Sequence, residues 1–142
     1  MNRELQEAYG QWFNELAPWS HFVTLTFRDP TPNTRNWTRP GWAYAERAWK
    51  EFCAQASPLQ TEFPWIRVTE LQPWRGAPHF HALLDIADAE QLRLASSWFS
   101  AKYGFNRVLE YDPEKGAATY IAKYVAKDLS DIRFSTHLSS TN

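Results

Sequence analysis

Two β-type segments on either side of a short turn constrain the fold of this chain most strongly. The segments are WIRVTELQ (65–72) and HFHALLDI (79–86), and the sequence PWRGAP joins them. Runs rich in β-branched and aromatic residues that flank a turn containing Pro and Gly predict a β-hairpin. We take PWRG (73–76) as the loop. The starting point is therefore an antiparallel pair of strands.

The predicted hairpin brings two histidines and a glutamate together. Successive residues of a strand point to opposite faces, so His79 and His81 share one face and Phe80 points to the other. The four-residue loop places Glu70 opposite His79, and directly opposed residues share a face with Cβ atoms ~5 Å apart. Two imidazoles and one carboxylate with open positions suit a catalytic divalent ion, Mg or Mn rather than Zn. Glu110 is the alternative carboxylate, and a pair of solvated strand histidines is the competing interpretation.

The rest of the chain alternates between helix-type and strand-type patterns. Apolar residues recur at helical spacing in some segments and at every second position in others. The resulting order of elements, α-β-α-β-β-α-β-α, predicts an α+β fold in which helices pack on one face of an antiparallel β-sheet and leave the other face free. The expected segments are helices over 3–16, 40–56, 88–104 and 113–128, further strands over 20–27 and 105–111, and a loop over 28–38.

Length and composition fit one domain. We expect residues 1–142 to form a single domain, with an N-terminal helix within 1–19 and a polar tail over 130–142. Cys53 is the only cysteine, so no intrachain disulfide can form and a reducing, cytoplasmic location is expected. No apolar run approaches the ~20 residues of a membrane span, and the first residues lack the apolar core of a signal peptide. The net charge of −1 argues against nucleic-acid binding by bulk positive charge.

The segment YIAKYVAK (120–127) repeats the pattern Tyr, apolar, Ala, Lys. At ~100° per residue, Tyr120, Lys123, Tyr124 and Lys127 fall within an arc of about 100° on a helix, opposite the aliphatic residues. We expect the aliphatic side to be buried and the tyrosines and lysines to project from the open face. A neighbouring lysine favours the phenolate of a tyrosine and stabilises charge on a phosphate. The alternative is that the tyrosines are half-buried packing residues and the lysines only solubilise the helix.

These motifs resemble a known family. FVTLTF on the first strand, PHFHALL with Glu70 upstream, and YIAKYVAK on a late helix resemble, in this order, the three motifs of the HUH single-strand DNA endonucleases. The two-tyrosine form is most similar to rolling-circle replication initiators of the phage gene A type, over about residues 20–130. The resemblance implies a ferredoxin/RRM-like HUH nuclease fold. It also implies an enzyme that cuts single-stranded DNA through a 5′-phosphotyrosine link and leaves a free 3′-OH that primes synthesis.

The resemblance also implies roles for individual residues. It makes Tyr120 the initiating nucleophile, because Lys123 matches the lysine that follows the first tyrosine of the family. It implies an origin or nick-site hairpin as the DNA substrate, a host replication helicase and polymerase as partners, and no membrane. The implied site consists of the metal ligands Glu70, His79 and His81 and the catalytic residues Tyr120, Tyr124, Lys123 and Lys127.

Two loops have the composition of single-stranded DNA contacts. Such DNA binds through stacking on aromatic rings and local positive charge. The segment TPNTRNWTRPGW (31–42) carries arginines and tryptophans without any acid, and the hairpin turn adds one more of each. The expected DNA contacts are Arg35, Trp37, Arg39 and Arg75, with Thr24 and Thr26 lining the site.

Other functions stay open at this point. A transposase or mobilisation relaxase would use the same chemistry. A non-enzymatic single-stranded nucleic-acid binding module would use the aromatic residues as a stacking platform and would not need Glu70, His79 or His81. A metal-dependent phosphohydrolase without a covalent step would need neither tyrosine.

Overall fold

The computed structural model describes residues 3–28, 41–58, 62–71, 78–122, 124 and 131–136. Within these ranges the helices and strands follow the predicted order, and a short C-terminal strand that the sequence pattern did not predict is added. The elements are α1 (Arg3–Leu16), β1 (His21–Phe27), α2 (Trp42–Ala56), β2 (Trp65–Leu71), β3 (Pro78–Leu84), α3 (Ala89–Lys102), β4 (Gly104–Glu110), the π-helical segment η1 (Ala118–Ala122) and β5 (Ile132–Phe134).

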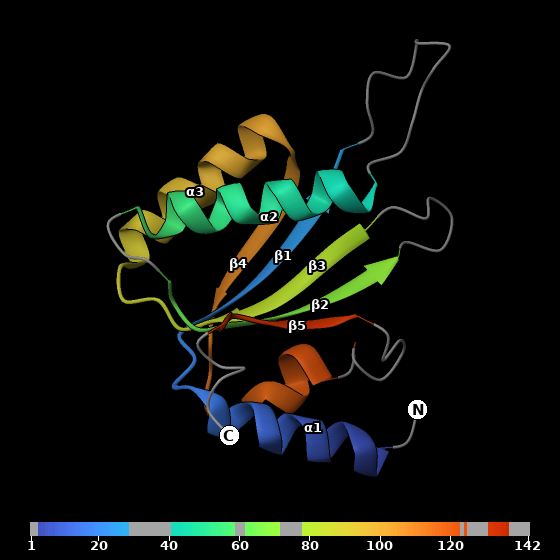
Figure 1. The fold of residues 1–142 in the computed structure, drawn as a ribbon. Coiled ribbons are helices and arrows are strands. Elements are labelled where there is room, and N and C mark those ends of the chain that lie inside the picture. The colour runs from blue at the N-terminus through green and yellow to red at the C-terminus, as the bar shows by residue number, and fades with distance from the viewer. Residues whose placement is uncertain are drawn as a thin grey trace.

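The strands form one antiparallel sheet in the order β4-β1-β3-β2-β5 (Figure 1). The succession β1-α2-β2-β3-α3-β4 is the ferredoxin-like βαββαβ arrangement. The predicted α+β class is therefore confirmed. The hairpin register is also as predicted, with Glu70 opposite His79 and Val68 opposite His81. Among the described residues, no helix is both long and apolar enough to cross a membrane.

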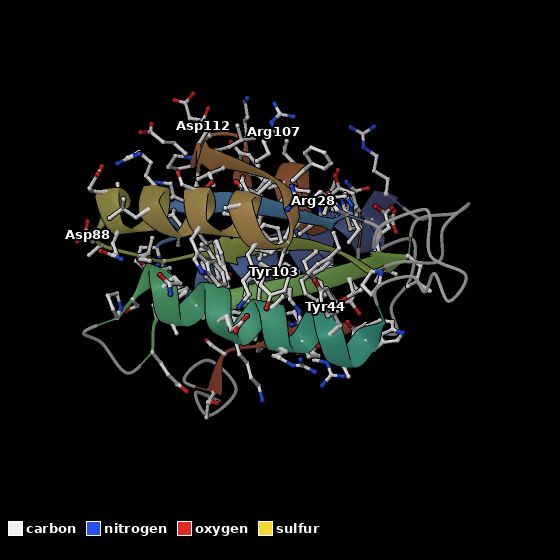
Figure 2. All side chains as sticks on the ribbon, turned by 90° about the horizontal axis from the view of Figure 1, so that it is seen from above. Arg28, Tyr44, Asp88, Tyr103, Arg107 and Asp112 are labelled. Carbon is white, nitrogen blue, oxygen red and sulfur yellow. The ribbon has the colours of Figure 1, made fainter. Side chains whose placement is uncertain are left out.

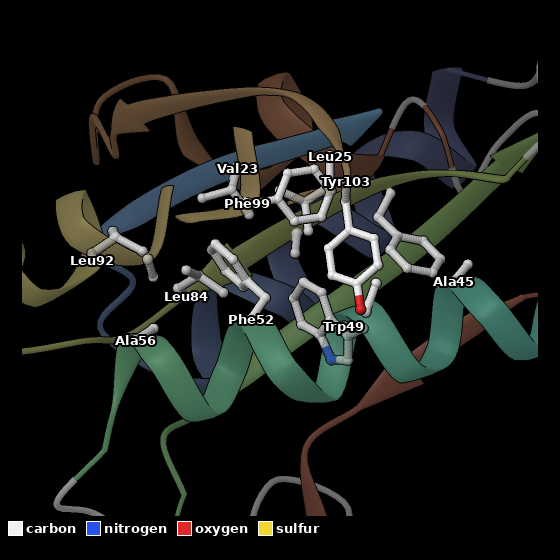
Figure 3. Packing of buried hydrophobic residues seen from close by; sticks show 14 of the residues in the cluster. Val23, Leu25, Ala45, Trp49, Phe52, Ala56, Leu84, Leu92, Phe99 and Tyr103 are labelled. Carbon is white, nitrogen blue, oxygen red and sulfur yellow. The ribbon is translucent and has the colours of Figure 1, made fainter. Parts of the chain in front are cut away.

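Helices α2 and α3 cover one face of the sheet (Figure 1). The side chains of Trp49 and Phe52 on α2 and Phe99 on α3 are buried there (Figure 3). The strands contribute residues of one parity, such as Leu25, which is fully buried. Burial of this continuous apolar surface is what holds the two helices on the sheet.

The opposite face is partly covered, which corrects the expectation of a free face. Helix α1 and η1 pack below this face in Figure 1, and Phe13 and Ile121 are fully buried there. The reason is the row formed by Phe22, Leu83 and Ile66 across β1, β3 and β2, which is apolar and needs cover.

The same face changes character along the strands. Where β1 and β2 end and β3 begins, the apolar row gives way to a polar row formed by Thr26, His79 and Glu70. Polar side chains do not require apolar cover, so this end of the face can hold a chemical site.

Candidate metal centre

Two threonines of β1 face the two histidines of β3. Thr26 lies opposite His79 and Thr24 lies opposite His81, so all four side chains share one face of the sheet. The Thr26 Oγ1 atom is 3.0 Å from His79 Nδ1, and the Thr24 Oγ1 atom is 3.2 Å from His81 Nδ1. These hydrogen bonds occupy Nδ1 of each ring and leave Nε2 as the atom that can bind a metal.

The predicted metal ligands come together. Glu70, His79 and His81 each offer one ligand atom, and these atoms lie within 4.8 Å of one another. The Oε1 atom of Glu70 is 3.3 Å from His81 Nε2. His81 is only 3% exposed, whereas the Glu70 side chain is 29% exposed and faces the open end of the site.

This donor set fits a divalent cation. Two neutral imidazoles and one carboxylate leave coordination positions open for substrate oxygens, as a catalytic rather than a purely structural site requires. A metal-bound imidazole usually donates its other ring N–H to an acceptor that fixes its tautomer. Thr24 and Thr26 supply such acceptors. The threonines were expected to contact DNA, and the structure gives them contacts with the histidines instead.

Glu110, the alternative carboxylate, lies outside this group. It is paired with His21 across β1 and β4, and this register places it on the face of the sheet that α2 and α3 cover. Burial lowers the pKa of the His21 imidazole, and the nearby Glu110 carboxylate opposes that shift. Glu110 is therefore excluded as a ligand by the strand register.

The ring of Tyr124 stacks on the imidazole of His81. The ring centroids are 3.6 Å apart and the planes differ by 6°. Phe22 also lies beside His81, with its ring parallel to the imidazole at 6.2 Å. Tyr124 thus directly contacts a residue of the metal group.

Tyr120 lies elsewhere. It is 9% exposed, and its ring contacts those of Phe22 and Tyr111 at 5.4 and 5.2 Å. Its hydroxyl accepts a hydrogen bond from the backbone N–H of Asp112 at 3.1 Å. The expectation that both tyrosines project from an open helix face was therefore wrong for Tyr120. Tyr120 lies within the π-helical segment, whose i→i+5 bonds give more residues per turn than the α-helical spacing assumed from the sequence.

Several predicted residues lie outside the described part of the chain, and their roles stay predictions. Two residues on β4 that sequence reasoning missed, Phe105 and Arg107, lie on the same face as the histidines. The alternation within β4 was visible in the sequence, but its pairing with β1 was not. The undescribed site residues are Lys123, Lys127, Arg35, Trp37, Arg39 and Arg75.

Fold and site together define an α+β protein with a ferredoxin-like sheet that carries a His–His–Glu metal-binding group on its polar end. The sequence profile of a family described as replication-associated protein, of the ORF2 and gene II protein type, matches residues 20–129, which include β1, the hairpin and both tyrosines. Since the match spans most of the chain, the protein belongs to this family of replication-associated proteins, in agreement with the rolling-circle resemblance. The comparisons with curated proteins and with solved structures gave no match.

Proposed function

We propose that this protein nicks and rejoins specific single-stranded DNA through a 5′-phosphotyrosine intermediate in a metal-dependent reaction, and thereby initiates rolling-circle replication. The observation that carries the proposal is the stacking of Tyr124 on His81 at 3.6 Å, within a group whose three ligand atoms lie within 4.8 Å of one another. A nucleophile and a metal-binding group thus adjoin at one end of the sheet. Membership of a replication-associated family supports DNA as the substrate.

Glu70, His79 and His81 would hold the cation, with Mg or Mn as the expected ion because the remaining ligands would be phosphate oxygens and water. When bound, a divalent ion supplies Lewis-acid polarisation of the scissile phosphate. The protein keeps both imidazole rings oriented through the hydroxyls of Thr24 and Thr26.

In the proposed cleavage step, the phenolic oxygen of Tyr124 forms a bond to the phosphorus of the scissile phosphodiester. The bond between phosphorus and the 3′ oxygen breaks, and the phenolic proton ends on that oxygen. The products are a 5′-phosphotyrosine and a free 3′-OH. Because the phosphodiester to tyrosine retains the energy of the broken bond, the reverse reaction rejoins DNA without ATP.

The positions of the tyrosines support Tyr124 as the first nucleophile, which reverses the order expected from the sequence. Tyr120 would act second, after its hydroxyl leaves the backbone N–H of Asp112. A second nucleophile is useful when the first is already esterified to DNA and another strand must be cut. Lys123 and Lys127 are proposed to supply the positive charge that lowers the pKa of each phenol.

A denaturing gel tests the proposal. The protein is incubated with Mn²⁺ and a pool of labelled single-stranded oligonucleotides, and we expect an adduct that survives detergent and heat. DNA cleavage without an adduct would instead indicate a phosphohydrolase, and binding without cleavage would indicate a non-enzymatic binding module. A transposase or relaxase would also form the adduct, and the family match favours the replication role over these.

A further inference from the structure

Phe105 and Arg107 on β4 continue the two rows of the metal centre to the edge of the sheet. Phe105 lies opposite Thr26, and Arg107 lies opposite Thr24. Both threonines face the histidines on their other side, so Phe105 and Arg107 project from the same face as the metal group. Figure 2 shows Arg107 on β4 at this edge.

Both side chains are open to solvent. Phe105 is 66% exposed, the largest value among the exposed large apolar residues of the described chain. A single exposed apolar residue is common on protein surfaces. What distinguishes Phe105 is its combination with a partly exposed arginine two residues away, which forms no ion pair with the described residues.

The backbone next to Phe105 is held tightly against β1. A Cβ atom added to Gly104 would lie 2.1 Å from the carbonyl oxygen of Thr26 and 2.7 Å from the backbone N of Arg28, so no side chain fits. The position of the Phe105 ring beside Thr26 is thus set by strand pairing and by a residue that only glycine can occupy. It does not depend on a loop.

The charge of this strip is positive. The residues of β4 that face the site are Phe105, Arg107 and Leu109, and the one acid of the strand, Glu110, points to the other face. Neighbouring strands lie about 4.8 Å apart, so Phe105 is about 10 Å from His79 across the intervening β1. That separation is of the size of a nucleotide or two.

We propose that Phe105 and Arg107 form a nucleotide-binding strip that leads single-stranded DNA into the metal centre. An unpaired base stacks on the Phe105 ring, and the Arg107 guanidinium binds a backbone phosphate. The occupant is a single strand because a base inside a duplex does not offer its face to an edge-strand side chain. This inference rests on the proposed function, since it identifies how the DNA approaches the same site.

Fluorescence anisotropy with fluorescein-labelled oligothymidine in EDTA measures binding without cleavage. Phe105→Leu keeps an apolar side chain but removes the aromatic face, and we expect binding at least about fivefold weaker, whereas Phe105→Tyr should bind like the original protein. Arg107→Gln should reduce the slope of log affinity against log salt by about 0.7, the value for one phosphate contact with a single strand.

Matched control variants lie on α3, which covers the other face. Leu94→Ala removes an apolar side chain that is 46% exposed, and Arg93→Gln removes an exposed guanidinium. Both should leave the affinity and the salt slope unchanged. Ultraviolet cross-linking to 5-iododeoxyuridine in the oligonucleotide should label the tryptic peptide that contains Phe105, because halogenated pyrimidines cross-link to stacked aromatic rings.

An affinity of Phe105→Leu equal to that of the original protein, or an unchanged salt slope for Arg107→Gln, overturns the strip, and so does a failure of the original protein to bind oligothymidine. The adduct assay decides the proposed function separately. Adduct formation with unaltered binding by the β4 variants rejects the strip and leaves the nicking activity standing. Loss of binding by these variants in a protein that forms no adduct supports the strip and rejects the nicking activity.

Discussion

The aromatic ring of Tyr124 lies almost parallel to the imidazole of His81, with centroids 3.6 Å apart. The contact joins the late helical motif to the central strand of the sheet, between segments more than 40 residues apart in the chain. It distinguishes Tyr124 from Tyr120, which is buried and hydrogen-bonded to Asp112. The two tyrosines of the repeated motif therefore have different surroundings before any DNA binds.

Removal of the Tyr124 hydroxyl should nearly abolish the covalent adduct. Tyr124→Phe keeps the ring that stacks on His81 and loses only the proposed nucleophile, so we expect a decrease of at least about 100-fold in initial adduct formation. Quantified gel bands over time, with Tyr9→Phe on α1 as the control, provide the measurement. Adduct formation at the original rate would assign initiation to Tyr120.

Tyr120→Phe should have two separable effects. The ring contacts with Phe22 and Tyr111 remain, but the hydrogen bond from the Asp112 N–H is lost, so unfolding in urea should become easier by about 1 kcal/mol. First-strand nicking should persist, whereas transfer to a second strand should fail. If this variant completes repeated cycles of cleavage and joining, Tyr120 is only a packing residue.

The metal group should be essential for cleavage but not for DNA binding. His81→Ala removes one of three ligands, and chelation removes the ion, so either change should reduce Mn²⁺-dependent cleavage to background. Binding of oligothymidine should remain within about threefold of the original, because stacking and phosphate contacts lie elsewhere. Full cleavage by His81→Ala in the presence of EDTA would contradict a metal-dependent mechanism.

Thr26 should tune metal affinity through His79. Thr26→Val preserves side-chain shape but removes the hydroxyl that lies 3.0 Å from Nδ1, and loss of such a partner typically weakens metal binding by about 10- to 100-fold. Calorimetric titration with Mn²⁺ measures the change. Thr69→Val is the matched control: it lies on the other face of β2, opposite Phe80, and its buried hydroxyl has no hydrogen-bond partner among the described residues. Equal affinities for the two variants would rule out a role for the Thr26 contact.

Alkaline pH should destabilise the protein through Tyr103. Burial, together with the hydrogen bond to Glu51, raises the pKa of Tyr103 to about 12, against ~10 in an unfolded chain. The native state keeps this proton when the unfolded state has lost it, so the contribution is fully present below about pH 10 and is lost as pH rises toward 12. Urea denaturation at about pH 9 and about pH 11 should show a smaller loss of stability for Tyr103→Phe than for the original protein. An identical loss in both proteins would mean that Tyr103 titrates normally.

The pairing of Glu70 with His79 could be predicted from the sequence because it is a local property. A hairpin with a short loop has few registers, and alternation along each strand decides which side chains share a face. The ligand group needed only residues within this hairpin. The order of elements and the α+β class followed in the same way from periodic apolar patterns and turn residues.

Contacts between distant segments were decided only by the tertiary structure. The pairing of β1 with β3 and β4 aligned Thr24 and Thr26 with the histidines and brought Phe105 beside Thr26, and no local pattern specifies which strands become neighbours. The apolar row that includes Phe22 drew α1 and η1 onto a face expected to be free. The π-helical turn then changed the angular relation of Tyr120 to the residues after it, because a helical wheel drawn from sequence assumes one fixed number of residues per turn.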